Sequence, residues 1–117
     1  MNNGEAILAP EKRAPGYMMM HKVTRVEYKP VGVMGCIVPW NYPFHNVFNP
    51  LVANLFAGNA LVIKVSEYAS WSTGYYSRII SAALQAAGAP PDLVQIVTGY
   101  GEAGNALVTG GVGKVRV

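Results

Sequence analysis

Three short apolar runs constrain the fold of this chain more than any other feature. They are VGVMGCIV at 31–38, ALVIKV at 60–65 and LVQIV at 93–97. Uninterrupted apolar runs of this length are typical of strands that are covered on both faces. The stretches between them are long enough for the helical crossovers that parallel neighbours require. The pattern predicts an α/β fold, a partial doubly wound (Rossmann-like) parallel sheet with helices on both faces.

The segments between the runs carry helix signals. Asn49 followed by Pro50 is a good cap and first-turn pair, which predicts a short helix through Ala57 that Gly58 ends. A second helix is predicted over 71–87 and is closed by Gly88. Its apolar stripe consists of Tyr76, Ile79, Ile80, Ala83, Leu84 and Ala87. A short helix over 102–108 and a fourth strand over 114–117 complete the pattern.

The N-terminal part has a weaker pattern. Residues 1–16 hold two prolines and two glycines without a sustained period, and we interpret them as an N-terminal arm that precedes one domain over 17–117. From Met18 to Tyr28 the sequence alternates loosely as a half-buried strand, with Val23, Val26 and Tyr28 at the packed positions. Because the chain stops inside its fourth predicted strand, we expect the domain to be truncated at its C-terminus.

Composition excludes several classes of protein. The chain has 117 residues, of which 51% are hydrophobic and 13% charged, so it is globular and limited to one domain. The net charge of +3 is too diffuse for a nucleic-acid surface. No apolar stretch reaches the roughly 20 residues of a membrane segment, and the N-terminus lacks the apolar centre of a signal peptide. The single cysteine excludes an internal disulfide and suits a reducing compartment, so we expect a cytoplasmic chain.

Glycines follow the third apolar run in the segment GYGEAG. Gly99, Gly101 and Gly104 stand between a predicted strand and a predicted helix, where backbone amides can approach a pyrophosphate. The segment follows the third strand and not the first, and the chain ends before an acidic residue about 20 positions on could bind ribose. A plain turn and helix entry explains it equally well. The pentapeptide GNALV occurs at 58–62 and at 104–108, but it is too short to define a repeat.

A set of motifs in one order is more specific. Pro39-Trp40-Asn41-Tyr42-Pro43 follows the first run, Gly58-Asn59 ends the predicted helix, and Lys64-Val65-Ser66-Glu67 closes the second run. In this order and spacing, the sequence from about Tyr28 onward resembles the aldehyde dehydrogenase superfamily, and it is most similar to a plant and fungal branch. The resemblance implies that 17–117 is part of an NAD-binding domain.

The resemblance also implies roles for particular residues. Asn41 would donate its side-chain amide to the oxygen of the aldehyde, where negative charge develops during attack by a thiolate. Lys64 and Glu67 would bind the adenosine ribose hydroxyls, and the Glu67 carboxylate would favour NAD over the phosphorylated NADP. The wall beneath the cofactor would be formed by Ile37, Val38, Pro39 and Trp40, with Gly101 near the adenine. Without the resemblance, Asn41 is a loop-capping residue and Lys64 and Glu67 are a solvated pair.

Other reactive side chains are given no catalytic role. Cys36 lies in a predicted buried strand, whereas the nucleophile of the family lies in a downstream segment that this chain does not have, so we interpret Cys36 as structural. His21 and His45 have no cysteine or carboxylate at a spacing that suits a triad, and the sequence predicts no metal site.

We therefore interpret the chain as a fragment of an NAD-dependent aldehyde dehydrogenase. The intact parent would oxidise an aldehyde and would be a homo-oligomer. The fragment alone would be inactive, because it lacks the nucleophilic cysteine and the general-base glutamate of the family. The alternative is a non-catalytic interaction or regulatory protein that reuses half of a dehydrogenase domain.

Overall fold

The computed structural model describes residues 4–111 and 114–116, and the chain divides after Pro30 into two compact units. The first unit contains the helix α1 (Gly4–Ile7), the strand β1 (Glu11–Arg13), a 3-10 turn η1 (Tyr17–Met19) and the strand β2 (Thr24–Val26). The second unit contains all the remaining elements, and each unit is described by itself.

The first unit is built around an antiparallel hairpin. β1 pairs with β2, and Lys12 lies opposite Arg25. The prediction of a half-buried strand over Met18–Tyr28 is wrong in extent, because only three residues of it form a strand and all three are exposed. Val23 and Tyr28 are exposed as well, since a two-stranded ribbon has no second layer to cover its side chains. The Tyr28 hydroxyl donates to Glu11 Oε1 at 2.8 Å, and this bond to a carboxylate raises the pKa of Tyr28.

The second unit is a parallel sheet. It consists of β3 (Val33–Val38), β4 (Ala60–Val65), β5 (Val94–Thr98) and β6 (Lys114–Arg116) in the order β5-β4-β3-β6. Taken in chain order, this is the 3-2-1-4 arrangement that begins the common dinucleotide-binding fold. The predicted fold class is confirmed, and the predicted strands agree with the observed ones to within two residues.

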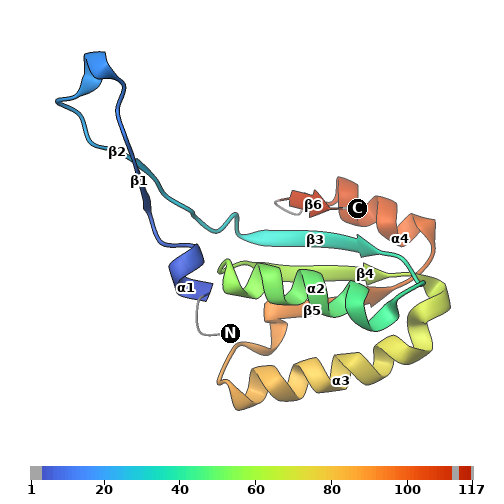
Figure 1. Cartoon of the computed structure of the whole chain (residues 1–117). Helices are drawn as coiled ribbons and strands as arrows, with labels where there is room; N and C mark the ends of the chain where they lie inside the picture. The colour runs from blue at the N-terminus through green and yellow to red at the C-terminus, as the bar shows by residue number, and fades with distance from the viewer. Residues whose placement is uncertain (1–3, 112–113, 117) are drawn as a thin grey trace. The chain divides into compact units, whose positions relative to one another are not determined.

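Helices cover both faces of this sheet, as Figure 1 shows. On β4, Leu61, Ile63 and Val65 are fully buried in the main core, which they share with side chains of α2 (Pro43–Phe56) and α3 (Ser70–Ala86). The alternate residues of β4 face the other way, where Val62 and Lys64 line a cavity together with residues of α4 (Gly101–Thr109). Continuous apolar strands are therefore explained by two covered faces.

The helix α2 begins earlier than the sequence predicted. The first turn contains Pro43, where a missing N–H costs nothing, and Pro50 lies in the helix interior. The expectation that Asn49 caps this helix is therefore wrong. Either proline could open a helix, and packing favours a start at Pro43. The predicted end is confirmed, since Gly58 has φ of 78° after the C-cap.

The helix α3 lies within one residue of its predicted range. Its buried residues are Thr73, Ile80 and Leu84, so the buried stripe is narrower than predicted, and Ile79 is exposed. The Thr73 hydroxyl is satisfied inside the helix by donating to the Ala69 carbonyl at 2.7 Å. Among the described residues, no helix is both long and apolar enough to cross a membrane.

Candidate functional site

The predicted site residues gather at one edge of the sheet. β3, β4 and β5 run parallel, so the segments that follow them leave the sheet at the same carboxyl edge (Figure 1). Asn41 follows β3, Glu67 follows β4 and Gly101 follows β5. In open α/β sheets this edge is where ligands bind.

The loop after β3 presents Asn41. This residue is exposed and lies just before α2, whose first turn is closed by a hydrogen bond from the Asn46 amide to the Tyr42 carbonyl at 2.8 Å. The Asn46 side-chain nitrogen donates to the Pro39 carbonyl at 3.1 Å and to Asn41 Oδ1 at 3.2 Å. The sequence did not predict Asn46 as part of the site. No local signal indicated it, because the sequence predicted that the helix begins only at Pro50, after Asn46.

Lys64 and Glu67 lie at the end of β4. Lys64 is 7% exposed, and its side chain shares a wall with Val62 and Val97 beneath α4. Among the described residues, no hydrogen bond or ion pair engages its ammonium group. Glu67 is half-buried at the start of the 3-10 turn η2 (Glu67–Ala69), and its Oε2 accepts from the Ser66 hydroxyl at 3.2 Å. One carboxylate oxygen therefore remains free to accept hydrogen bonds from a ligand.

The predicted cofactor wall runs along the end of β3. Ile37 and Val38 are half-buried, whereas Pro39 and Trp40 are exposed. The Trp40 ring meets the Tyr68 ring edge to face at a centroid distance of 6.3 Å, and the two rings line a cavity of about 470 Å³. Tyr68 was not singled out from the sequence, because nothing local indicates that it lies near Trp40.

The glycine segment after β5 opens α4. Gly99 has φ of 155°, a conformation that suits glycine, and Gly101 is the exposed first residue of the helix. Gly104 is buried, and a Cβ there would lie 3.7 Å from Ile37 Cδ1, which is ordinary contact. The segment therefore forms a turn and helix entry over the end of β3.

Cys36 is 2% exposed within β3. It lines a cavity of about 190 Å³ between β3 and α2 together with His45, Asn46 and Asn49. The sequence spacing did not indicate that Cys36 and His45 would share a cavity wall. His21 belongs to the first unit. Within the described part of the chain, no group of three or more histidine, cysteine or acidic residues could hold a metal ion.

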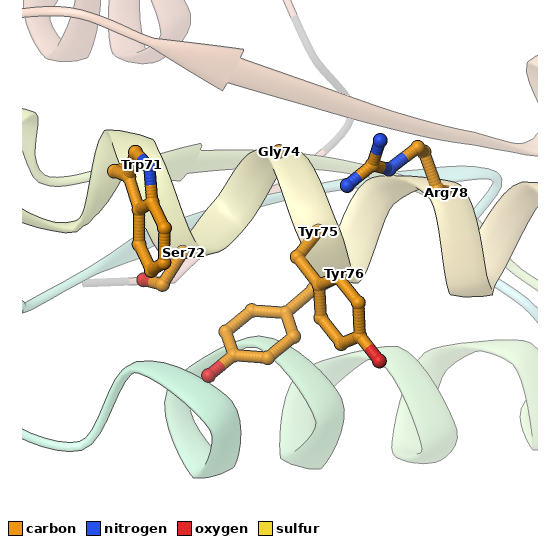
Figure 2. Close-up of a pocket in the computed structure, with 6 residues that line it drawn as sticks. All are labelled: Trp71, Ser72, Gly74, Tyr75, Tyr76 and Arg78. Atoms are coloured by element: carbon orange, nitrogen blue, oxygen red, sulfur yellow. The ribbon is translucent and has the colours of Figure 1, made fainter.

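A larger cavity, of about 600 Å³, lies elsewhere in this unit. Figure 2 shows its lining, which comes entirely from α3. In this view Tyr75 and Tyr76 project toward α2, where the Tyr76 ring packs edge to face against Phe44 and Phe48. The lining residues are Trp71, Ser72, Gly74, Tyr75, Tyr76 and Arg78. None of the predicted site residues lines this cavity.

The strand order and the ligand-binding edge together define a doubly wound α/β protein of the dinucleotide-binding type. The family model described as "Aldehyde dehydrogenase family" matches residues 4–116, and the chain belongs to this family. Over 96 residues it is 45% identical to an aldehyde dehydrogenase-like protein of Schizosaccharomyces pombe, a match that covers 82% of this chain and 18% of the relative. Over 100 residues it is 42% identical to another aldehyde dehydrogenase-like protein, from Saccharomyces cerevisiae. That match covers 82% of this chain and 15% of the relative. The predicted family is confirmed, and these two relatives are fungal, which agrees with the fungal part of the predicted plant and fungal branch.

Solved structures agree with this assignment. The protein PnpE, solved in complex with nicotinamide adenine dinucleotide, superposes with a TM-score of 0.69 at 33% identity, covering 92% of this chain and 20% of that one. A glyceraldehyde-3-phosphate dehydrogenase of Methanocaldococcus jannaschii, solved with NADP, shares the fold. It superposes with a TM-score of 0.72 at 23% identity, covering 86% of this chain and 21% of that one. The chain thus spans less than a fifth of the length of the two fungal relatives that it matches.

Proposed function

We propose that this chain provides the oxyanion donor and part of the cofactor cradle of an NAD-dependent aldehyde dehydrogenase. The observation that carries the proposal is the convergence of Asn41, Glu67 and Gly101 on the carboxyl edge of one parallel sheet. Residues 17–117 would then be part of the NAD-binding domain, with 1–16 as an arm. The whole protein would oxidise an aldehyde to a carboxylic acid and would form a homo-oligomer.

Asn41 would stabilise the reacting carbonyl. Attack on an aldehyde moves negative charge onto its oxygen, and a fixed neutral donor stabilises that charge where it develops. Asn41 can act as such a donor. It is exposed, and its Oδ1 already accepts a hydrogen bond from Asn46, which leaves its side-chain nitrogen available. Removing such a donor typically lowers kcat by about 100-fold to 1000-fold.

Lys64 and Glu67 would hold the adenosine ribose. The hydroxyls of ribose can donate to a carboxylate and accept from an ammonium group, and both groups stand at the end of β4 with hydrogen-bonding capacity left over. Ile37, Val38, Pro39 and Trp40 would form the wall beneath the cofactor, and Gly101 would lie near the adenine. Bound at these residues, NAD would supply the acceptor for the hydride of the substrate.

Glu67 would also select between the two dinucleotides. A carboxylate beside the ribose accepts from both hydroxyls of NAD, whereas it repels the additional phosphate of NADP. Substituting Glu67→Gln keeps the shape and removes the charge. We expect the affinity for NAD to fall by roughly 10-fold to 100-fold, since hydrogen bonds to charged groups contribute about 1.5 to 3 kcal/mol. The preference for NAD over NADP should narrow.

Calorimetric titration of the protein with each dinucleotide tests this proposal. The matched control is Asp92→Asn, which removes an exposed carboxylate in the 3-10 turn η3 (Pro91–Leu93) before β5, at the opposite edge of the sheet. Equal effects of the two substitutions would contradict the assignment of Glu67. If the intact protein that carries this chain is folded and binds neither dinucleotide, the non-catalytic alternative is favoured.

The chain alone should not oxidise aldehydes. Asn41 can stabilise charge but cannot attack a carbonyl, and Cys36 is buried in the sheet. With NAD and short or long aldehydes, we expect no NADH above the blank, measured by absorbance. Turnover that disappears in Cys36→Ala would overturn the interpretation of Cys36 as structural.

A further inference from the structure

We propose that Asn46 is a positioning residue that determines which end of the Asn41 amide faces the substrate. This inference rests on the proposed function, in which the Asn41 nitrogen donates to the substrate oxygen. An asparagine amide has an oxygen that only accepts and a nitrogen that only donates, in almost the same shape. An unrestrained Asn41 would therefore present the wrong atom part of the time.

The orientation of Asn46 follows from the chemistry of its neighbour. The Pro39 carbonyl oxygen can only accept, so the atom of Asn46 that lies 3.1 Å from it must be the nitrogen. That nitrogen carries two hydrogens, and the second points to Asn41 at 3.2 Å. Facing a donor, Asn41 must present its oxygen. Its nitrogen is then directed away from Asn46.

Asn46 is suited to this role because it is held on a rigid element. Its backbone amide donates to the Tyr42 carbonyl at 2.8 Å in the first turn of α2. The next residue, Val47, is 1% exposed and anchors the helix in the core. Asn41, by contrast, lies in an exposed loop. The fixed helix thus transmits an orientation to the loop through one side chain.

Reversing the polarity of Asn46 should reverse Asn41. Asn46→Asp has nearly the same shape, but a carboxylate only accepts, so it would repel the Pro39 carbonyl and attract the Asn41 nitrogen. Asn46→Ala would only release Asn41 to both orientations. We therefore expect the aspartate to be more damaging than the alanine, whereas a purely space-filling role would give the opposite order.

An experiment on this chain tests the orientation without any catalysis. NMR measures how fast the side-chain amide protons of Asn41 exchange with water. In the unaltered chain we expect fast exchange for Asn41 and slow exchange for Asn46. In Asn46→Asp the Asn41 protons should become at least several-fold slower. Unchanged exchange of Asn41 would overturn the proposal, whatever the function of the site.

Kinetics of the intact protein that carries this chain test the consequence. We expect Asn46→Asp to lower kcat by about 100-fold, near the loss for Asn41→Ala, with little change in KM for the aldehyde, and Asn46→Ala to lower it by only a few-fold. Asn49→Asp is the matched control, because it adds the same charge to the same cavity wall one turn later.

Double variants separate the possible failures. If Asn46 acts through Asn41, Asn46→Asp should have almost no further effect once Asn41 is alanine. If the full loss of kcat persists in the double variant, or if Asn49→Asp loses as much, the aspartate acts by repelling charge, and the positioning role is overturned.

If Asn41→Ala itself leaves kcat unchanged, the proposed oxyanion role fails. Because the NMR result does not depend on kcat, that failure is distinguishable from a failure of the positioning role. Should Asn46→Asp fail to fold, the orientation of the Asn41 amide measured by NMR in Asn46→Ala decides: the amide should adopt both orientations there, and a single retained orientation would overturn the positioning role.

Discussion

The pentapeptide GNALV occurs twice in this chain and forms two different structures. The copy at 58–62 makes the turn after α2 and the first half of β4, whereas the copy at 104–108 lies entirely within α4. Gly58 has φ of 78°, but Gly104 is an ordinary helical residue. Because the five residues are identical, their intrinsic preferences cannot explain the difference.

The surroundings of the two copies decide their structures. Asn59 follows a helix that has just ended, and its Oδ1 accepts from the backbone amides of Val31 and Gly32 at 2.7 and 3.1 Å, which ties the turn to the start of β3. The residues after it then pair with β3 in register. Within the described residues the second copy pairs with no strand, and it continues a helix that began at Gly101. Each position of the pentapeptide therefore occurs in two environments, and the same substitution can be compared in both.

The largest difference is expected for the two leucines. Leu61 is 1% exposed in the main core, so Leu61→Ala should lower the free energy of unfolding by about 2 to 5 kcal/mol. Leu107 is half-buried beside the cavity beneath α4, so Leu107→Ala should cost less, about 1 kcal/mol. Chemical denaturation measures both. Equal losses would mean that the two faces of the sheet are equally important for stability.

A smaller difference is expected for the two asparagines. Asn59→Ala leaves two backbone donors without their acceptor and should cost about 1 to 3 kcal/mol. Asn105 is exposed, and alanine is the better helix former, so Asn105→Ala should be neutral or stabilise by about 0.5 kcal/mol. Denaturation midpoints at constant slope give both values. A neutral Asn59→Ala would show that water replaces the lost acceptor.

The smallest effects, of opposite sign, are expected for the two glycines. Gly58→Ala places a side chain in the left-handed region and should destabilise by about 1 kcal/mol. Gly104→Ala should stabilise by about 0.5 to 1 kcal/mol, because alanine favours the helix and its Cβ would only touch Ile37. Thermal melts followed by circular dichroism show the sign directly. Two shifts in the same direction would contradict this account of the pentapeptide.

The strands could be predicted from the sequence because their signal is strong and local. A strand such as β4, buried on both faces, needs an uninterrupted apolar run, and its bounds agree with the run at 60–65. The start of α2 could not be predicted in this way. Both Pro43 and Pro50 are acceptable at the first turn of a helix, and only the burial of Val47 against the sheet distinguishes them.

The candidate site could be predicted only in part. Strand ends and the family resemblance indicated Asn41, Lys64 and Glu67, and their roles stay predictions. Asn46 and Tyr68 were missed, since each belongs to the site through a contact that depends on the folded loops. Periodicity describes which face of an element is buried, but it says nothing of which exposed side chains meet.

The position of β6 beside β3 has a kinetic consequence. Val33 pairs with Ala60, whereas Met34 pairs with Lys114, so the second pairing closes a loop that is about three times longer. By the logarithmic dependence of loop closure, this adds on the order of 1 kcal/mol of entropy cost before any contact forms. The chain should therefore assemble β3, β4 and β5 first, with the last strand joining a sheet that already exists. Pulse-labelling hydrogen exchange during refolding would show this order as late protection of the β6 amides.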